Sequence, residues 1–354
     1  MADVQLTQFS HGAGCGCKIA PAVLDKILQT DIIQSHYPAL LVGNSSKDDA
    51  AVYDLGDGNA LISTTDFFVP IVDDPFQFGR IAAANAISDV YAMGGKPIMA
   101  LAILGWPVEK LSPEIAKLVV EGGRSICAEA GIPLAGGHSV DTAEPLFGLT
   151  VNGIVPIKHL KQNNTAKIGD ALFLTKPLGV GILSTAQKRG QLATEDLDLL
   201  IHQLNQLNKV GELLGGIEGV NAMTDVTGFG LIGHLMEMSE GSNLSAIIFY
   251  DQVPVIEAAK GYLAKRIVPD ATYRNWNAYS SQVGFEKGVD VMQAFSILPD
   301  PQTNGGLLIA VDPNAINLVK QVLTENGLGE FVNPIGKMTE KKEKTITVAL
   351  STTI

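Results

Sequence analysis

Residues 49–66, DAAVYDLGDGNALISTTD, decide how the first half of the chain folds. Two apolar runs, residues 50–55 and 60–65, flank a turn of glycine, aspartate and asparagine, and this order is typical of a β-hairpin. Asp49 precedes the first strand and Asp66 follows the second. Because the two outer ends of an antiparallel pair lie side by side, the hairpin predicts that these two carboxylates are close together.

A third acidic residue follows on a predicted helix. Residues 78–93 have helical apolar spacing and stop at two glycines, and Asn85 and Asp89 lie four residues apart on one face. The rest of the helix is small and apolar, which suits packing against a sheet. A polar pair of this kind is often only a solvated stripe, but the alanines around it leave little surface that favours water. The spacing therefore favours a site role for Asp89.

Further along, strands and helices mix in both halves of the chain, which predicts an α+β or α/β fold. We expect residues 97–104 to be a central, buried strand, because almost none of them is polar. The polar stretch 156–169 marks the junction between two domains. The other predicted strands are 132–135, 146–155, 171–175, 246–250, 305–311, 331–335 and 345–350, and the other predicted helices are 21–29, 112–130, 179–188, 195–214 and 313–326.

Two of the three cysteines lie in the stretch HGAGCGCK, residues 11–18. Its glycines supply no core side chains, and Lys18 favours the thiolate form of a neighbouring cysteine. The stretch therefore reads either as a flexible arm that carries a reactive sulfur or as an ordinary loose terminus. Cys15 and Cys17 are too few for a structural zinc site, although Cys127, His11 and His138 could in principle complete one. The one-residue spacer disfavours a disulfide between them.

Bulk properties exclude several classes of protein. A chain of 354 residues is long for one core, so we expect two domains. The formal net charge of −12 argues against nucleic acid as the main partner. Three cysteines give no disulfide framework, and neither a signal-peptide pattern nor an apolar run long enough for a membrane span is present. These features predict a cytoplasmic protein without a membrane partner.

Glycine-rich motifs offer two weaker nucleotide signals. No GxxxxGK[ST] occurs, which excludes a P-loop. A GxGxxG does occur at residues 228–233, with Asp251 downstream, but Asp225 lies just ahead of it and would repel a pyrophosphate unless a metal intervened. The stretch Gly136–Ser139 is expected to be a turn that binds an anion through its N–H groups, or an ordinary tight turn.

Taken together, these motifs resemble the selenophosphate synthase, or selenide, water dikinase, family of aminoimidazole ribonucleotide synthase-like ATP enzymes. Asn304 departs from the family pattern, where a serine is expected before the double glycine. The resemblance spans nearly the whole chain. It rests on residues 11–18, 48–49, 64–66, 85–89, 136–139, 224–230 and 300–306.

The resemblance implies a two-domain α+β fold with a mobile glycine-rich arm (residues 1–45), an ATP-binding and dimerisation domain (46–156) and a C-terminal domain (157–354). It implies a homodimer that converts selenide, ATP and water into selenophosphate, AMP and orthophosphate. Magnesium is the implied cofactor, potassium is a further candidate, and a selenium-delivery protein is a candidate partner. The implied catalytic residues are Cys15 and Lys18; the implied metal ligands are Asp49, Asp66, Asp89 and Asp225; the implied ATP contacts are Lys18, Ser46, Lys47, Asp48, Asp66 and Asp89, with Gly137, His138 and Ser139 from the partner subunit.

The chemistry of the residues agrees with these implications. A cluster of aspartates would repel ATP unless divalent cations bridged carboxylate and phosphate oxygens. Two other classes stay open from the sequence: another phosphoryl-transferring kinase or ligase of the same superfamily, and a non-enzymatic selenium or metal carrier that uses Cys15 and Cys17. The cysteine arm argues against the first, and the aspartates spread over both halves argue against the second.

Overall fold

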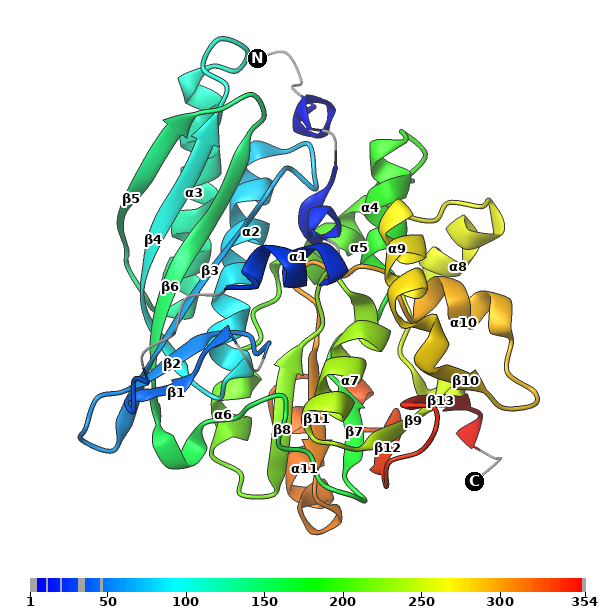
Figure 1. The fold of residues 1–354 in the computed structure, drawn as a ribbon. Helices are drawn as coiled ribbons and strands as arrows, with labels where there is room; N and C mark the ends of the chain where they lie inside the picture. The colour runs from blue at the N-terminus through cyan, green and yellow to red at the C-terminus, as the bar shows by residue number, and fades with distance from the viewer. Residues whose placement is uncertain (1–4, 11, 20, 31–35, 45–46, 352–354) are drawn as a thin grey trace.

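The chain folds around two β-sheets, one in each half of the sequence (Figure 1). The computed structural model describes residues 5–10, 12–19, 21–30, 36–44 and 47–351, and describes only the backbone of residues 15, 17, 21, 22 and 25. Both sheets are accompanied by helices, so the two-domain α+β prediction is confirmed.

The first sheet has six strands in the order β1-β2-β3-β6-β4-β5. The predicted hairpin forms its second and third strands, since β2 pairs antiparallel with β3 and Ala51 lies opposite Ser63. β3 then pairs along its whole length with β6, and β5 is an edge strand parallel to β4. The strands are β1 Leu40–Val42, β2 Ala51–Asp54, β3 Asn59–Phe68, β4 Lys96–Trp106, β5 Leu134–Asp141 and β6 Leu146–Pro156.

Two long helices, α2 (Pro75–Ala92) and α3 (Pro113–Ala130), cover one face of this sheet (Figure 1). Helix α2 begins three residues earlier than predicted, because the Asp74 carboxylate caps it by accepting a 2.7 Å hydrogen bond from the Gln77 N–H. The two helices approach closely: a Cβ on Gly79 would lie 1.8 Å from the Val119 carbonyl oxygen. This close contact packs α3 tightly against α2, the helix that carries Asn85 and Asp89.

The opposite face of the first sheet is open, which corrects the prediction that residues 97–104 form a fully buried strand. Strand β4 lies between β5 and β6, yet Ile98 is 40% exposed and Leu101 36% exposed. The helices α2 and α3 bury alternate side chains only, and the other set faces outward. An almost wholly apolar strand therefore leaves apolar side chains at the surface of the described chain.

The second sheet has seven strands in the order β10-β13-β9-β12-β7-β11-β8, with helices on both faces. Along β7, Leu172 and Leu174 pack with α7, and Phe173 packs on the other side with α6 and α11. The strands are β7 Ala171–Leu174, β8 Val220–Asp225, β9 Ser245–Phe249, β10 Val283–Phe285, β11 Leu307–Val311, β12 Gly336–Thr339 and β13 Ile346–Ala349. The helices of this half are α4 Val180–Lys188, α5 Thr194–Asn205, α6 Val210–Gly215, α7 Gly230–Gly241, α8 Glu257–Ala264, α9 Asp270–Tyr279, α10 Val291–Ile297 and α11 Ile316–Glu325.

Two predicted elements of this half are wrong. The single helix expected over 195–214 is the pair α5 and α6, because the chain extends at Gln206 and turns the Asn208 side chain into the interior. The strand expected over 331–335 begins only at Gly336, since Pro334 has no N–H to donate to the sheet.

The N-terminal segment lies against the body of the protein and not away from it. It contains the 3-10 turns η1 (Leu6–Phe9) and η2 (Gly14–Cys17) and the helix α1 (Pro21–Leu28), where a helix was predicted. Leu6 is buried in the main core. The predicted domain limits of 1–45, 46–156 and 157–354 stay predictions. Within the described ranges, no helix is both long and apolar enough to cross a membrane.

Candidate functional site

A cavity of about 730 Å³ lies where the two halves of the chain meet. Strand ends from both sheets, helix α2 and the N-terminal segment contribute to its walls. The cavity brings together the predicted site residues Lys18, Lys47, Asp48, Asp49, Asp66, Asp89 and Asp225.

Four elements deliver the aspartates that were predicted to bind metal. Asp49 lies two residues before β2, Asp66 lies in β3, Asp89 lies on α2, and Asp225 is the last residue of β8. Asp66 was predicted to follow the second strand of the hairpin, but β3 continues to Phe68 because it pairs with β6 along its whole length, so Asp66 lies inside the strand. Asp49 and Asp66 both line the cavity. Because Asp225 comes from the second sheet, the cluster forms only when the two halves pack together.

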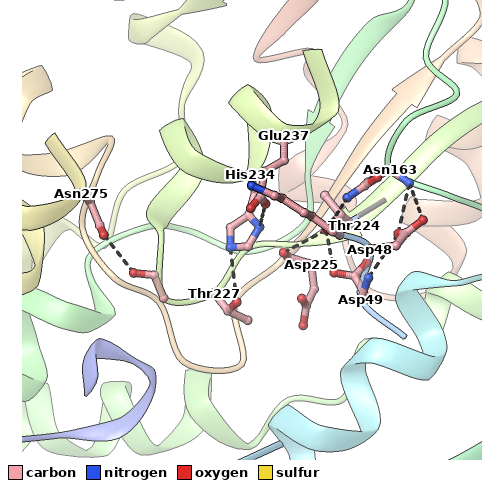
Figure 2. A network of polar contacts seen from close by, with 11 residues as sticks. Asp48, Asp49, Asn163, Thr224, Asp225, Thr227, His234, Glu237 and Asn275 are labelled. Atoms are coloured by element: carbon pink, nitrogen blue, oxygen red, sulfur yellow. Dashed lines mark hydrogen bonds and ion pairs between the residues drawn. The ribbon is translucent and has the colours of Figure 1, made fainter. Parts of the chain in front are cut away.

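Each carboxylate accepts a hydrogen bond from a neutral donor on a neighbouring element. The Thr224 hydroxyl donates to Asp49 Oδ1 at 2.8 Å, and the Ser88 hydroxyl donates to Asp225 Oδ2 at 2.6 Å. Figure 2 shows Thr224 beside Asp49, and Asp48 beside Asn163. The remaining donors are Thr64 to Asp89, Asn85 to Asp66, and the Asn163 N–H to Asp48.

The sequence reasoning missed most of these donors. Thr64 lies two residues before Asp66, Thr224 directly before Asp225, and Ser88 directly before Asp89. Each one, however, binds a carboxylate other than its sequence neighbour. A hydroxyl next to an aspartate was the only signal available, and it does not indicate which carboxylate the hydroxyl binds.

Burial and mutual repulsion make the cluster costly for the protein. Loss of solvation raises the pKa of Asp49 and of Asp89 well above the usual value, and the Asp225 charge raises both further. Burial also raises the pKa of Asp225, and it raises the pKa of Asp48 to about 7. Lys18 opposes the shift at Asp89 and Asp225. The carboxylates therefore require added positive charge to be fully ionised at neutral pH.

The donor set fits a hard divalent cation. Asp49 Oδ2 is shut off from solvent and has no hydrogen-bond partner, so a ligand oxygen lies unused inside the cavity. Within the described residues, no three His, Cys, Asp or Glu side chains are already arranged around a single point suited to an ion. The fit therefore rests on the oxygen chemistry and charge of the cluster, and the individual ligand assignments stay predictions.

The predicted glycine-rich turn at residues 136–139 is wrong. These residues continue strand β5, where Gly137 pairs with Ala102 and His138 with Ile103. The strand remains extended because Gly136 and Gly137 adopt φ values of 155° and 156°, which side-chain-bearing residues rarely adopt. Gly137, His138 and Ser139 do not line the aspartate cavity of this chain. They lie exposed on the edge strand of the first sheet.

The N-terminal segment brings Lys18 to the cavity. Its ammonium lies 6.0 Å from the centre of the Phe229 ring. The backbone of η2 runs through Cys15 and Cys17, whose side chains, like all of Ser46 and His11, lie outside the described part of the structure. Cys127 is fully buried in the core, and burial raises the pKa of its thiol to about 11, so it is unsuited to zinc or to nucleophilic chemistry.

Two domain families account for nearly the whole fold. The N-terminal domain of AIR synthase related proteins matches residues 47–155, and their C-terminal domain matches residues 167–349. Solved structures agree. The thiamine monophosphate kinase from Aquifex aeolicus has a TM-score of 0.61 at 17% identity over 92% of this chain and 94% of its own. The hydrogenase maturation protein HypE, in a structure with ATP, has a TM-score of 0.64 at 19% identity over 89% and 88%. At such identities these neighbours establish the fold only.

Curated relatives define the family more narrowly. Selenide, water dikinase from Aeromonas hydrophila is 55% identical over 340 residues, or 96% of both chains. Selenide, water dikinase from Photobacterium profundum is 60% identical over 315 residues, or 89% of this chain and 90% of the relative. The chain belongs to the selenide, water dikinase family, a family of enzymes.

Proposed function

We propose that the protein converts selenide, ATP and water into selenophosphate, AMP and orthophosphate. The observation that carries this proposal is the inter-domain cavity, which holds five aspartates and Lys18 in a chain that is 52–60% identical to selenide, water dikinases. The relatives' names supply the reaction, and the cavity supplies groups suited to a metal-bound triphosphate.

The aspartates of both sheets hold the phosphate chain through divalent cations in this proposal. Magnesium, when bound, neutralises carboxylates and phosphate oxygens and stabilises charge on the transferred group. Asp49, Asp66, Asp89 and Asp225 are its proposed ligands, and the donors described above orient them. Two successive phosphate losses require charge neutralisation at more than one position. Potassium is a further proposed cofactor, and turnover measured with and without potassium tests it.

The N-terminal segment supplies the nucleophile side of the reaction. Lys18 projects its positive charge into the cavity, where it would bind a phosphate oxygen. Cys15 is the proposed catalytic thiol, because the neighbouring Lys18 favours its thiolate form. Lys47, Asp48 and Ser46 are proposed nucleotide contacts; Lys47 and Asp48 line the cavity. A segment of glycines can close over the phosphates and exclude water from the first transfer.

A homodimer is proposed to complete the site. The open face of the first sheet carries exposed apolar side chains, including Tyr53 at 49% and Phe67 at 50% exposure. At the edge of the same sheet, β5 exposes Gly137, His138 and Ser139, the residues proposed to reach a partner's nucleotide. An apolar face beside an unpaired strand edge favours association with a second copy.

The products of the reaction test this function. With ATP, magnesium and selenide under anaerobic conditions, we expect AMP, orthophosphate and selenophosphate in equal amounts. Without selenide, AMP formation should fall at least tenfold. ADP as the final product would instead indicate a kinase of the same superfamily, and no nucleotide product at all would indicate a carrier. Either result would reject the proposed reaction.

A further inference from the structure

A second cavity, of about 520 Å³, lies beside the N-terminal segment and is separate from the aspartate cavity. Helices α4 and α9 and residues 301 and 303 form its far wall, and Gly12, Ala13 and Gly16 form its near wall. Lys18 lines both cavities, so the segment that carries it is the partition between them. Figure 1 shows the dark-blue N-terminal segment between the first sheet and helices α4 and α9.

The charge of the second cavity is opposite to that of the first. Its lining includes four basic residues, Lys18, Lys188, Arg189 and Arg274, and a single acidic residue, Asp270. This local excess of positive charge occurs in a protein whose formal net charge is −12. The side chains, and not a helix terminus, carry it, because the buried Asp300 carboxylate already accepts the Gly181 N–H at the start of α4.

Two of the basic residues hold the segment in place by its backbone. Lys188 Nζ donates to the carbonyl oxygens of Ser10 at 3.0 Å and Gly12 at 2.7 Å. Arg274 Nη2 donates to the carbonyl oxygen of Gly16, between the two cysteines, at 2.7 Å. Because a guanidinium has five N–H donors and an ammonium three, both groups retain donors for a ligand in the cavity.

Arg189 differs from these two residues. It directly follows the last residue of helix α4, with its side chain exposed at the cavity, and within the described ranges that side chain forms no hydrogen bond or ion pair. Its charge therefore contributes to the cavity without holding the segment. This separation lets a single substitution test the charge of the cavity alone.

We propose that this basic cavity binds a small inorganic monoanion and is the entrance by which the anionic selenium substrate reaches the N-terminal segment. This inference rests on the proposed function for the identity of the anion, since hydrogen selenide is a monoanion at neutral pH. ATP and selenide would then approach Lys18 from opposite sides. A positive entrance raises the local concentration of an anion that the aspartate cavity would repel.

The kinetic test compares wild type with Arg189→Gln and with Lys342→Gln, which removes the same charge from an exposed position outside the cavity. We expect Arg189→Gln to raise KM for selenide about fivefold at low ionic strength, with less effect in high salt. Its kcat and its KM for ATP should stay within twofold, and Lys342→Gln should match wild type. An unchanged KM for selenide in Arg189→Gln overturns the proposal. A change confined to inhibition by orthophosphate also overturns it, because the cavity would then serve the departing product.

Bromide provides a readout that does not depend on catalysis. Crystals of the full chain soaked in bromide should show an anomalous peak between Arg189 and Arg274 in wild type, and a weaker one in Arg189→Gln. No bromide in the wild-type cavity overturns the anion site. If wild type made no selenophosphate while bromide bound as expected, the proposed function would fail and the anion site would stand.

Discussion

At the scale of single residues, the aspartate cluster lowers the stability of the fold while it supplies the proposed metal ligands. Asp225 is 2% exposed and Asp89 8% exposed, and each raises the cost of ionising the other. Hydroxyl donors such as Ser88 lower this cost only in part, since a neutral donor adds no countercharge. The clustered carboxylates therefore become favourable only when bound cations neutralise their charge.

Replacing Asp225 by Asn should therefore separate stability from activity. The amide keeps the shape and can accept the Ser88 hydroxyl bond, while one buried negative charge is lost. We expect ATP turnover to fall more than about 100-fold. In metal-free buffer the free energy of unfolding should rise by about 1 kcal/mol. Asp198→Asn, on the exposed side of α5, is the control for both measurements. Wild-type turnover in Asp225→Asn at equal magnesium would remove this residue from the site.

Asp300 lies outside the cluster, and its burial leads us to expect that the free energy of unfolding depends on pH. Burial raises its pKa to about 8, although the Gly181 N–H and the Gln302 amide donate to it. Because the folded-state pKa lies above the unfolded value near 3.8, its contribution is complete below about pH 4 and is lost as the pH rises through about 8.

We expect Asp300→Asn to reduce this pH dependence. The melting temperature of wild type relative to the variant should fall between pH 5 and pH 8. Because the two proteins are compared at each pH, the contributions of the other titrating groups to the melting temperature cancel. Equal shifts in both proteins across this range would show that Asp300 does not titrate there in the folded state.

The structure explains why an asparagine is suited to position 304, where the chain departs from the family pattern. It adopts φ 46°, a left-handed conformation that asparagine tolerates better than most residues. Its side-chain amide donates to the carbonyl oxygens of Leu204 at 2.7 Å and Gln206 at 2.8 Å, and its N–H donates to Asn85. The residue therefore links the loop after α10 to α2 and to the end of α5.

At the scale of elements, the edge strand β5 depends on two neighbouring glycines for different reasons. Gly136 and Gly137 have nearly equal φ values, 155° and 156°. A Cβ on Gly137 would lie 2.1 Å from the Ala102 carbonyl oxygen, whereas a Cβ on Gly136 would meet its nearest neighbour, Leu101, at 3.8 Å. Only Gly137 is required by contact with β4.

The pair gives a matched experiment. Gly136→Ala carries the conformational strain alone, and we expect it to lower the free energy of unfolding by about 1 kcal/mol. Gly137→Ala adds the clash with β4 and should lower it by about 3 kcal/mol or more. Urea denaturation measures both. Equal losses in the two variants would contradict the close packing of β5 on β4.

Element type was predicted well where the local pattern was strong. The hairpin of residues 49–66 and the helix around Asp89 were confirmed because turn residues and apolar spacing act over a few neighbours. The turn expected at Gly136–Ser139 was wrong because glycine permits both a turn and an extended strand with positive φ. Pairing with β4 decided between them.

At the scale of the whole molecule, the open face of the first sheet predicts self-association. The exposed Tyr53 and Ile154 lie in one cross-strand row with the half-buried Leu61 between them. Ile98 and Leu101 extend the apolar surface over β4. Sedimentation equilibrium at micromolar concentration should give a mass near twice 37.4 kDa.

Leu101→Arg should weaken this association at least tenfold, because it places a charge on the apolar face. The matched control is Leu318→Arg on α11, where the side chain is 49% exposed but lies on the second half of the chain. Wild type that sediments as a fully active monomer would contradict the dimer. Equal effects of the two substitutions would place the interface elsewhere.

The sequence by itself determined the local elements of the site and the family of the chain. The hairpin, the spacing of Asn85 and Asp89, and the glycine-rich segment with Lys18 all depend on neighbouring residues, so they can be read in order along the chain. Only the tertiary structure decided that Asp225 lies with Asp89 and that Ser88, 137 residues away along the chain, holds it. It also decided that Arg274, separated from Gly16 by 258 residues, binds the N-terminal segment. Contacts of this kind form when residues far apart in the sequence pack together. The local sequence pattern of either half therefore cannot predict them.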